Sequence, residues 1–257
     1  MVLGIISAVV ALAAAVVACG LPRINLPRTA GLEGIEDLDA AQAYDRISRW
    51  PQFRLLRRII ARELARYRPE GSLADIGCGP GRLVMLIAQR HPHLRVVGLD
   101  AADEMIRAAS LNVSSQNLSD RVEFRKGDVS NLPLPDGTLD FVVSTLSLHH
   151  WSHPSHGLGQ MHRVLRPGGQ VLLFDLRRDP RRFFYWLLRF AQAIVVPTGL
   201  RRIGEPLGSL LSSYTVAELE GLLGRSKFTE WRIAGGAGWV FVWARKQLRE
   251  IEIDREC

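Results

Sequence analysis

The segment SLADIGCGPG, residues 72–81, is the most informative stretch of this chain. Small and apolar residues lead to Asp75, and glycines follow at Gly77, Gly79 and Gly81. This pattern predicts a buried strand that turns sharply into a helix. Glycine tolerates positive φ angles, and its missing side chain lets a ligand approach the main chain closely. The segment therefore predicts a ligand-binding loop.

The glycine spacing and the neighbouring acid restrict the kind of ligand that this loop can take. Loops that bind the pyrophosphate of dinucleotides follow the spacing G-x-G-x-x-G, whereas this loop has the spacing G-x-G-x-G. Asp75 would repel a pyrophosphate, and it would instead attract a cationic or hydroxyl-bearing ligand. The loop thus disfavours NAD and favours S-adenosylmethionine, whose amino group and sulfonium are positive.

Strand-like and helix-like patterns alternate along the rest of the chain, which predicts an α/β fold with a mostly parallel sheet covered on both faces. We expect strands at residues 73–77, 95–99, 122–125, 138–145, 170–175, 229–234 and 239–244, and helices at 54–67, 81–90, 102–112, 155–165 and 216–223. Ligands of such sheets bind outside the carboxyl ends of the strands. The glycine loop, Asp100, Asp128 and Ser144 all fall at or near such ends, so we expect them to converge on one cleft.

These segments occur in an order that resembles the class I S-adenosylmethionine-dependent methyltransferases. Within that class, the chain is similar to the small-molecule group that includes the ubiquinone and menaquinone methyltransferases. The resemblance covers about residues 44–246 and does not include the N-terminus. It implies a doubly wound, seven-stranded, mostly parallel sheet of the Rossmann-like methyltransferase type. It also implies S-adenosyl-L-methionine as the cofactor and a small, lipophilic acceptor that resembles a lipid or a quinone.

The resemblance also assigns cofactor contacts to residues outside the loop. Asp100 would accept hydrogen bonds from the ribose hydroxyls, or it would cap the next helix. Asp128 would meet the adenine amino group, or it would only form a turn. Tyr44 would close over the cofactor, or it would pack in the core. The other expected cofactor-binding residues are Asp75, Gly77, Cys78, Gly79, Gly81, Ala101, Met105, Val129 and Ser144, and plain packing is the alternative for Cys78 and Met105.

Two histidines follow the fourth predicted strand, where the methyl group should leave the sulfonium. His149 or His150 could take a proton from an attacking hydroxyl or carbon acid, or both could simply shape the loop. Methyl transfer depends mainly on orientation and desolvation of the two reactants, so a general base is optional. His153 and His156 lack acidic partners at metal-ligand spacing, and we expect no metal.

The N-terminal residues 1–22 carry no charged side chain and have about the length, roughly 20 residues, that crosses a bilayer. We interpret them as a transmembrane or signal-anchor segment that forms an N-terminal hydrophobic helix. A cleaved signal peptide, a lipoprotein signal ending at Cys19 and a buried or disordered helix are the alternatives. Arg23 and Arg28 follow the segment and favour the cytoplasmic side. We therefore expect a membrane-anchored protein whose catalytic domain, residues 41–246, faces the cytoplasm, with a linker at 23–40 and a polar tail at 247–257.

An aromatic and apolar segment with arginines at both ends occupies residues 177–202. Its length and its internal Arg189 argue against a membrane span. An interfacial helix with an apolar face is one interpretation, and this helix would be a hydrophobic lid over the acceptor. Ordinary packing of a helix against the sheet is the other.

The composition limits the remaining function classes. The 257 residues carry a formal net charge of +7, which favours anionic partners such as lipid or nucleic acid. Because no compact run of basic residues occurs, we expect no nucleic-acid partner. The alternatives to a methyltransferase are a dinucleotide-dependent oxidoreductase and an inactive, membrane-tethered cofactor-binding module. The loop spacing argues against the first, and the intact acids argue against the second. The sequence does not predict the oligomeric state.

Overall fold

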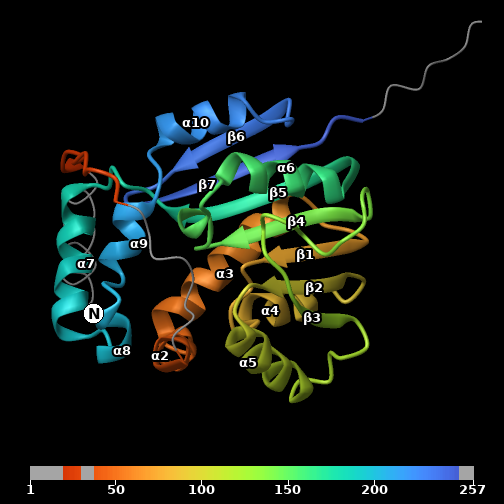
Figure 1. The fold of residues 1–257 in the computed structure, drawn as a ribbon, viewed down its shortest axis with the longest axis horizontal. Helices are drawn as coiled ribbons and strands as arrows, with labels where there is room; N and C mark the ends of the chain where they lie inside the picture. The colour runs from red at the N-terminus through yellow and green to blue at the C-terminus, as the bar shows by residue number, and fades with distance from the viewer. Residues whose placement is uncertain (1–19, 30–37, 249–257) are drawn as a thin grey trace, which may run out of the picture.

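The fold is built around one seven-stranded sheet with the strand order β3-β2-β1-β4-β5-β7-β6 (Figure 1). We describe it from a computed structural model, which describes residues 20–29 and 38–248. The strands are β1 (Ser72–Ile76), β2 (Arg95–Asp100), β3 (Val122–Lys126), β4 (Leu139–Thr145), β5 (Leu165–Leu176), β6 (Glu230–Gly235) and β7 (Trp239–Arg245). β1 to β5 run parallel, and β7 pairs antiparallel with both β5 and β6. The predicted doubly wound, mostly parallel sheet is therefore confirmed.

Two apolar clusters lie on the two faces of this sheet, because successive strand side chains point to opposite faces. In β4, Val142 belongs to one cluster, whereas Phe141 and Val143 belong to the other. The first cluster also contains buried residues of α6 (Pro154–Val164) and α10 (Val216–Gly224). The second contains those of α3 (Pro51–Arg66) and α4 (Arg82–Arg90), and Val113 of α5 (Asp103–Ser114). Helices therefore cover both faces, as expected for continuous apolar strands of a parallel sheet.

Four further helices lie beyond the carboxyl ends of the parallel strands, at the left of Figure 1. They are α2 (Leu38–Ser48), α7 (Arg182–Ile194), α8 (Thr198–Arg202) and α9 (Leu207–Ser212). Ala43 and Ile47 of α2 pack on Leu200 of α8. This group of helices is positioned to cover the end of the sheet where ligands of this fold type bind.

Residues 21–29 contact the domain along their length, although the sequence predicts a spacer from residue 23. The Ile24 amide donates to the carbonyl of Pro180 at 3.0 Å, and the Thr29 amide donates to that of Leu211 at 3.2 Å. The Arg28 guanidinium adds a hydrogen bond to the Tyr214 hydroxyl at 2.9 Å. The described part of the predicted linker is thus bound to the domain through its backbone and its arginines.

The predicted elements lie close to the observed ones, with differences at boundaries. β5 begins at Leu165 and includes residues 166–169, which lie between the predicted helix at 155–165 and the predicted strand at 170–175. The strand extends because the Gly168 amide donates to the Lys246 carbonyl and the Lys246 amide donates to the Gly169 carbonyl, both at 2.9 Å. The predicted N-terminal hydrophobic helix falls on residues 1–19, which lie outside the described residues. Among residues 20–29 and 38–248, none of the helices has the length and hydropathy that a membrane span requires.

Candidate active site

The glycine loop follows β1 and leads into α4, as predicted. Gly77, Gly79 and Gly81 have φ values of 74°, 53° and 73°, which are unfavourable for other residues. A Cβ at Gly77 would lie 2.3 Å from the Ser147 Oγ. At Gly79 the nearest atom would be Tyr44 Cε1, at 3.6 Å. The first glycine therefore lets a neighbouring loop approach, whereas the second leaves its backbone open toward a cavity.

Asp100, at the end of β2, fixes the geometry of this loop. Its Oδ2 accepts a hydrogen bond from the Gly79 amide at 2.8 Å, and its Oδ1 accepts one from the Ala102 amide at 3.0 Å. Burial raises the pKa of the Asp100 carboxyl, although these amide bonds oppose the shift. The carboxylate thus joins the loop to the start of α5, and its other lone pairs remain able to accept from ligand hydroxyls.

Asp75 is a buried carboxyl without a protein partner. Its side chain is 1% exposed, and neither oxygen has a hydrogen bond. Burial and the nearby charge of Asp100 raise its pKa to about 7. An isolated buried carboxylate is costly unless a cation or a donor pairs with it. The pair of acids behind the glycine loop therefore fits a cationic ligand and disfavours a phosphate.

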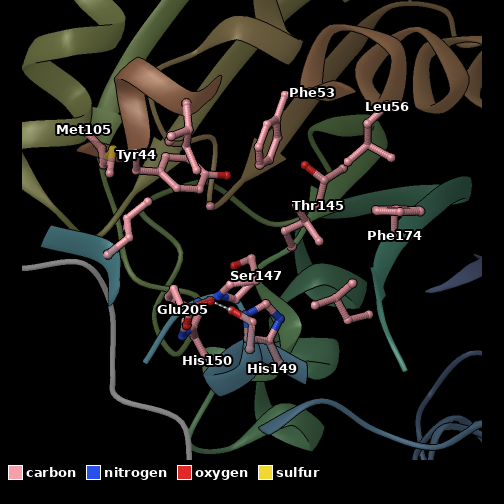
Figure 2. A pocket seen from close by; sticks show the side chains of 18 of the residues that line it. Tyr44, Phe53, Leu56, Met105, Thr145, Ser147, His149, His150, Phe174 and Glu205 are labelled. Atoms are coloured by element: carbon pink, nitrogen blue, oxygen red, sulfur yellow. Dashed lines mark hydrogen bonds between the residues drawn. The ribbon is translucent and has the colours of Figure 1, made fainter. Parts of the chain in front are cut away.

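A cavity of about 940 Å³ lies above the loop, and Figure 2 shows side chains that line it. Its walls include these predicted site residues: Tyr44, Gly77, Gly79, Asp100, Ala101, Met105, Asp128, Val129, His149 and His150. Asp75, Cys78, Gly81 and Ser144 are not among the lining residues. The structure therefore brings ten of the fourteen predicted residues to one cavity.

Two of the remaining predicted contacts, Cys78 and Ser144, are turned away from the cavity for identifiable reasons. Cys78 packs in the core beneath the loop, where burial raises the pKa of its thiol. The Ser144 hydroxyl donates to the Ile76 carbonyl at 2.6 Å. Because strand side chains alternate, the next residue, Thr145, lines the cavity instead. Packing is the role that the structure shows for Cys78 and Ser144.

Asp128 and Tyr44 both line the cavity, and each also makes a local contact that fits its alternative, structural role. The Asp128 Oδ1 accepts a hydrogen bond from the Ser130 amide at 2.6 Å, so Asp128 forms a turn and also lines the cavity. Tyr44 projects from α2 toward the glycine loop (Figure 2) and meets Phe53 edge-on, with ring centroids 6.4 Å apart. Burial, and then the charge of Asp100, raise its pKa to about 12. Tyr44 is thus a neutral wall of the cavity.

Salt bridges hold α2 in this place. The Asp45 carboxylate pairs with Arg82 of α4 at 2.8 Å, and the Arg82 Nε also donates to the Ser48 hydroxyl at 2.8 Å. The two side chains of the pair are only 19% and 18% exposed, so water screens them less than a surface pair. The position of Tyr44 therefore depends on a bridge between α2 and the helix that begins at the glycine loop.

His149 has a buried acidic partner. Both His149 and His150 lie in the short 3-10 helix η1 (Leu148–His150). The His149 Nδ1 lies 2.6 Å from Oδ1 of Asp175 in β5, and the His149 amide donates to the Oδ2 of the same carboxylate at 3.0 Å. His150 lines the cavity, with its ring centroid 4.1 Å from that of His149. The structure thus assigns the buried acid partner to His149, which the sequence could not do.

The His149–Asp175 pair has the properties of a general base. Burial alone would lower the pKa of His149, but the charge and hydrogen bond of Asp175 outweigh it and raise that pKa. Because the carboxylate accepts from Nδ1–H, the neutral ring presents an unprotonated Nε2. This Nε2 is buried without a protein partner, in a side chain that lines the cavity. His149 can therefore accept a proton from a bound molecule.

Glu205 is a cavity residue that the sequence analysis missed. It lies beside the histidines in Figure 2 and accepts a hydrogen bond from the Ser209 hydroxyl. Burial raises the pKa of its carboxyl, and its charge helps to raise the pKa of His149. The sequence contains one signal that could have drawn attention to Glu205: it is the only acidic residue between positions 180 and 217. Only the fold brings this residue next to η1.

The remaining walls of the cavity are mostly apolar. They come from α3, from the end of β5, from α7 and α8, and from the start of β7. The apolar residues of this part include Phe53, Leu55, Leu56, Ile59, Phe174, Leu176, Phe184, Leu188, Ala191, Val195, Leu200 and Trp239. The cavity thus has a polar end at the glycine loop and an apolar end. His149 is one of the residues that line this cavity. Within the described part of the chain, no cluster of three or more histidine, cysteine or acidic side chains could hold a metal ion.

Comparisons with known proteins agree with this geometry. Residues 74–173 match a family profile described as a methyltransferase domain. A demethylmenaquinone methyltransferase of Deinococcus radiodurans is 29% identical, over 62% of this chain and 63% of its own length. A 27-O-demethylrifamycin SV methyltransferase of Amycolatopsis mediterranei is 36% identical, over 42% of this chain and 39% of its own length. This chain thus spans less than two thirds of the length of both enzymes.

A solved structure from Methanococcus maripaludis, described as an S-adenosyl-L-methionine-dependent methyltransferase, has the same fold. The TM-score is 0.65 at 21% identity, with 86% of this chain and 99% of that chain covered. The fold, the glycine loop with its paired acids and the family profile lead to one conclusion. This chain carries a class I S-adenosylmethionine-dependent methyltransferase domain, and S-adenosyl-L-methionine is the cofactor of that domain.

Proposed function

We propose that this protein transfers a methyl group from S-adenosylmethionine to a hydroxyl-bearing, lipophilic small molecule at a membrane. The observation that carries the proposal is the buried His149–Asp175 pair. His149 lines a cavity with mostly apolar walls, and its Nε2 has no protein partner. A base at this position is useful for an acceptor that must lose a proton. Apolar walls select an acceptor with an apolar framework.

The residues at the glycine loop fit the cofactor. The open backbone at Gly79 and the carboxylate of Asp100 would hold the sugar and the chain beside it, and Asp128 with Val129 would meet the base. Asp75 has two buried oxygens without a partner, so it would balance the positive charge of the ligand. When bound, S-adenosylmethionine supplies a methyl group activated by a positively charged sulfur.

His149 would act on the acceptor. Its Nε2 would accept the proton of the attacking hydroxyl, and Asp175 would stabilise the imidazolium ion that forms. Tyr44 and the apolar walls would exclude water, which strengthens these interactions. The same proton transfer serves attack by the oxygen itself or by a ring carbon of a hydroquinone, and identification of the product distinguishes the two.

Two further lines support a lipophilic, membrane-derived acceptor. The two similar enzymes are named for demethylmenaquinone and for 27-O-demethylrifamycin SV, which supports a small-molecule acceptor. The uncharged residues 1–22 support a membrane anchor, and the arginines that follow them support a catalytic domain on the cytoplasmic side. We therefore propose a membrane-anchored enzyme that faces the cytoplasm.

The test combines product discovery with a variant of the base. The full chain is incubated with methyl-labelled S-adenosylmethionine and a total lipid and metabolite extract, and labelled products are identified by mass spectrometry. We expect His149→Gln to lower the turnover rate by about 100-fold or more, the usual range for a general base, with unchanged cofactor affinity. His93→Gln is the control, because His93 lies outside the cavity, where it contacts the Pro69 carbonyl and the His91 ring. Full turnover by His149→Gln, or no labelled small molecule at all, would contradict the proposal.

A further inference from the structure

Helix α7 exposes a stripe of large apolar side chains. Trp186, Leu187, Phe190 and Ile194 are 57%, 54%, 62% and 70% exposed. Leu187, Phe190 and Ile194 follow the three- and four-residue spacing of one helix face. No residue of α7 is buried, and in Figure 1 the helix lies at the outer edge of the molecule. Large exposed apolar patches of this kind mark interaction sites.

The apolar stripe continues into the cavity. Phe184, Leu188 and Ala191 of α7 line the cavity with the adjacent face of the helix. Val195, directly after α7, both lines the cavity and is 48% exposed. A residue that does both lies at the opening. The exposed stripe of α7 therefore borders the mouth of the cavity.

Helix α3 also contributes exposed apolar residues to the cavity wall. Leu55 and Ile59 line the cavity, yet they are 58% and 47% exposed. We call seven exposed apolar residues of these segments the apolar rim: Leu55, Ile59, Trp186, Leu187, Phe190, Ile194 and Val195. Three of them, Leu55, Ile59 and Val195, also line the cavity.

Positive charge is concentrated around the apolar rim. Residues 51–66, which form α3, contain five arginines and one glutamate, and residues 181–202 contain five arginines and no acid. Arg54, Arg58 and Arg62 are exposed beside the α3 part of the rim. On α7, the exposed Arg189 lies over the Trp186 ring, 5.4 Å from its centroid. An exposed apolar face between arginines matches the headgroup region of an anionic bilayer.

The chain leaves the described structure beside the same helix. The Leu21 carbonyl accepts a hydrogen bond from the Arg181 guanidinium at 2.8 Å, and the Pro22 carbonyl accepts one from the Arg182 amide at 3.0 Å. The uncharged residues 1–20 therefore join the domain at the first turn of α7. An anchor formed by them would hold the apolar rim close to the bilayer.

From these observations we infer that α3 and α7 dock on the surface of an anionic lipid bilayer, with the apolar rim at the boundary between headgroups and acyl chains. The cavity then opens directly into the lipid, and the acceptor enters without crossing water. The docking surface itself does not depend on the chemistry in the cavity, whereas the route of the acceptor rests on the proposed function. Docking and methyl transfer can therefore be tested separately.

The test measures the depth of single positions in the bilayer. An environment-sensitive fluorophore is attached to Phe190→Cys, or to Leu111→Cys as the control, in full chains whose Cys19 and Cys257 are replaced by serine. Leu111 is also apolar and 76% exposed, but it lies on α5, far from α7 in Figure 1. Vesicles of phosphatidylcholine with phosphatidylglycerol carry brominated acyl chains, which quench a probe inside the bilayer. We expect strong quenching at position 190 and none at position 111.

A charge variant separates docking from anchoring. Arg182→Gln with Arg189→Gln should lower the ratio of docked to undocked protein by roughly 30-fold. Arg90→Gln with Arg225→Gln removes the same charge from exposed positions elsewhere and should leave quenching unchanged. Equal quenching at positions 190 and 111 on vesicle-bound protein would overturn the inference. So would a probe at position 190 that is already in an apolar environment without vesicles, since residues 1–20 or a second copy would then cover the rim. A protein that docks without transferring methyl would refute the proposed function alone.

Discussion

Replacement of Asp75 by asparagine separates the stability of this fold from its ligand affinity. Both carboxyl oxygens of Asp75 are buried without a partner, and the burial and the charge of Asp100 raise the pKa from 3.8 to about 7. This difference corresponds to about 4 kcal/mol at about 1.4 kcal/mol per pKa unit. Asparagine has nearly the same shape and cannot ionise, so it removes this cost.

The sign of the effect follows from linkage between protonation and folding. The folded chain binds the Asp75 proton more tightly than the unfolded chain. Stability from the protonated form is therefore fully present below pH 3.8, is lost progressively as the pH rises to about 7, and is absent above that value. We expect the free energies of unfolding of wild type and Asp75→Asn to be similar near pH 4. Near pH 8, the variant should be more stable by up to about 4 kcal/mol.

Urea unfolding of the ligand-free proteins across this pH range measures the difference. Asp120→Asn is the control, because Asp120 is exposed, and it should follow the wild type at every pH. Cofactor binding should show the opposite trend. Affinity of the wild type for S-adenosylmethionine should rise as the pH passes through 7, because the ionised carboxylate behind the glycine loop attracts the cation. Asp75→Asn should bind weakly at every pH. Parallel stability curves for wild type and Asp75→Asn would refute our account of this buried acid.

Three further substitutions test the walls of the cavity. Gly77→Ala would place a methyl group 2.3 Å from the Ser147 hydroxyl oxygen. We therefore expect calorimetry to show at least a tenfold loss of cofactor affinity. Gly137→Ala is the control: Gly137 also has a positive φ, but no atom lies within 4 Å of its added methyl group, so this change should cost only about 1 kcal/mol of stability. Asp45→Asn removes the bridge that holds α2, so affinity should fall several-fold while Tyr44 fluorescence reports a looser helix, and unchanged affinity would exclude this positioning role. Ala191→Trp fills the apolar end of the cavity, and it should raise the KM for a bulky acceptor without changing cofactor affinity; an unchanged KM would place the acceptor elsewhere.

The strands and the glycine loop could be predicted because their signals are local. The apolar run before Asp75 and the glycines after it specify a strand, a turn and a helix within a few residues of one another. The acid at the end of the second strand could be placed in the cleft in the same way, because parallel strands present their carboxyl ends at one edge. Asp100 occupies the predicted place and also holds the Gly79 amide at 2.8 Å.

Other features could not be read from the sequence because they depend on contacts between distant segments. The sequence offered His149 and His150 on equal terms, and the choice depends on Asp175, which lies 26 positions further along the chain. Glu205 lies further still from η1, 56 positions after His149, and it reaches the cavity only because α8 and α9 fold over the end of the sheet. The assignment of His149 as the base depends on its acidic neighbours, and these residues come together only in the folded chain.

By itself, therefore, the sequence determined the sheet, the glycine loop and the kind of ligand that the loop attracts, because backbone preference and apolar pattern act over a few residues. Only the tertiary structure decided that Ser144 is buried, that His149 has an acidic partner, and that residues of α3 and α7 line one cavity. These three features depend on the alternation of side chains along a strand, on the pairing of residues that are distant in sequence, and on burial. Each of these depends on where the rest of the chain lies.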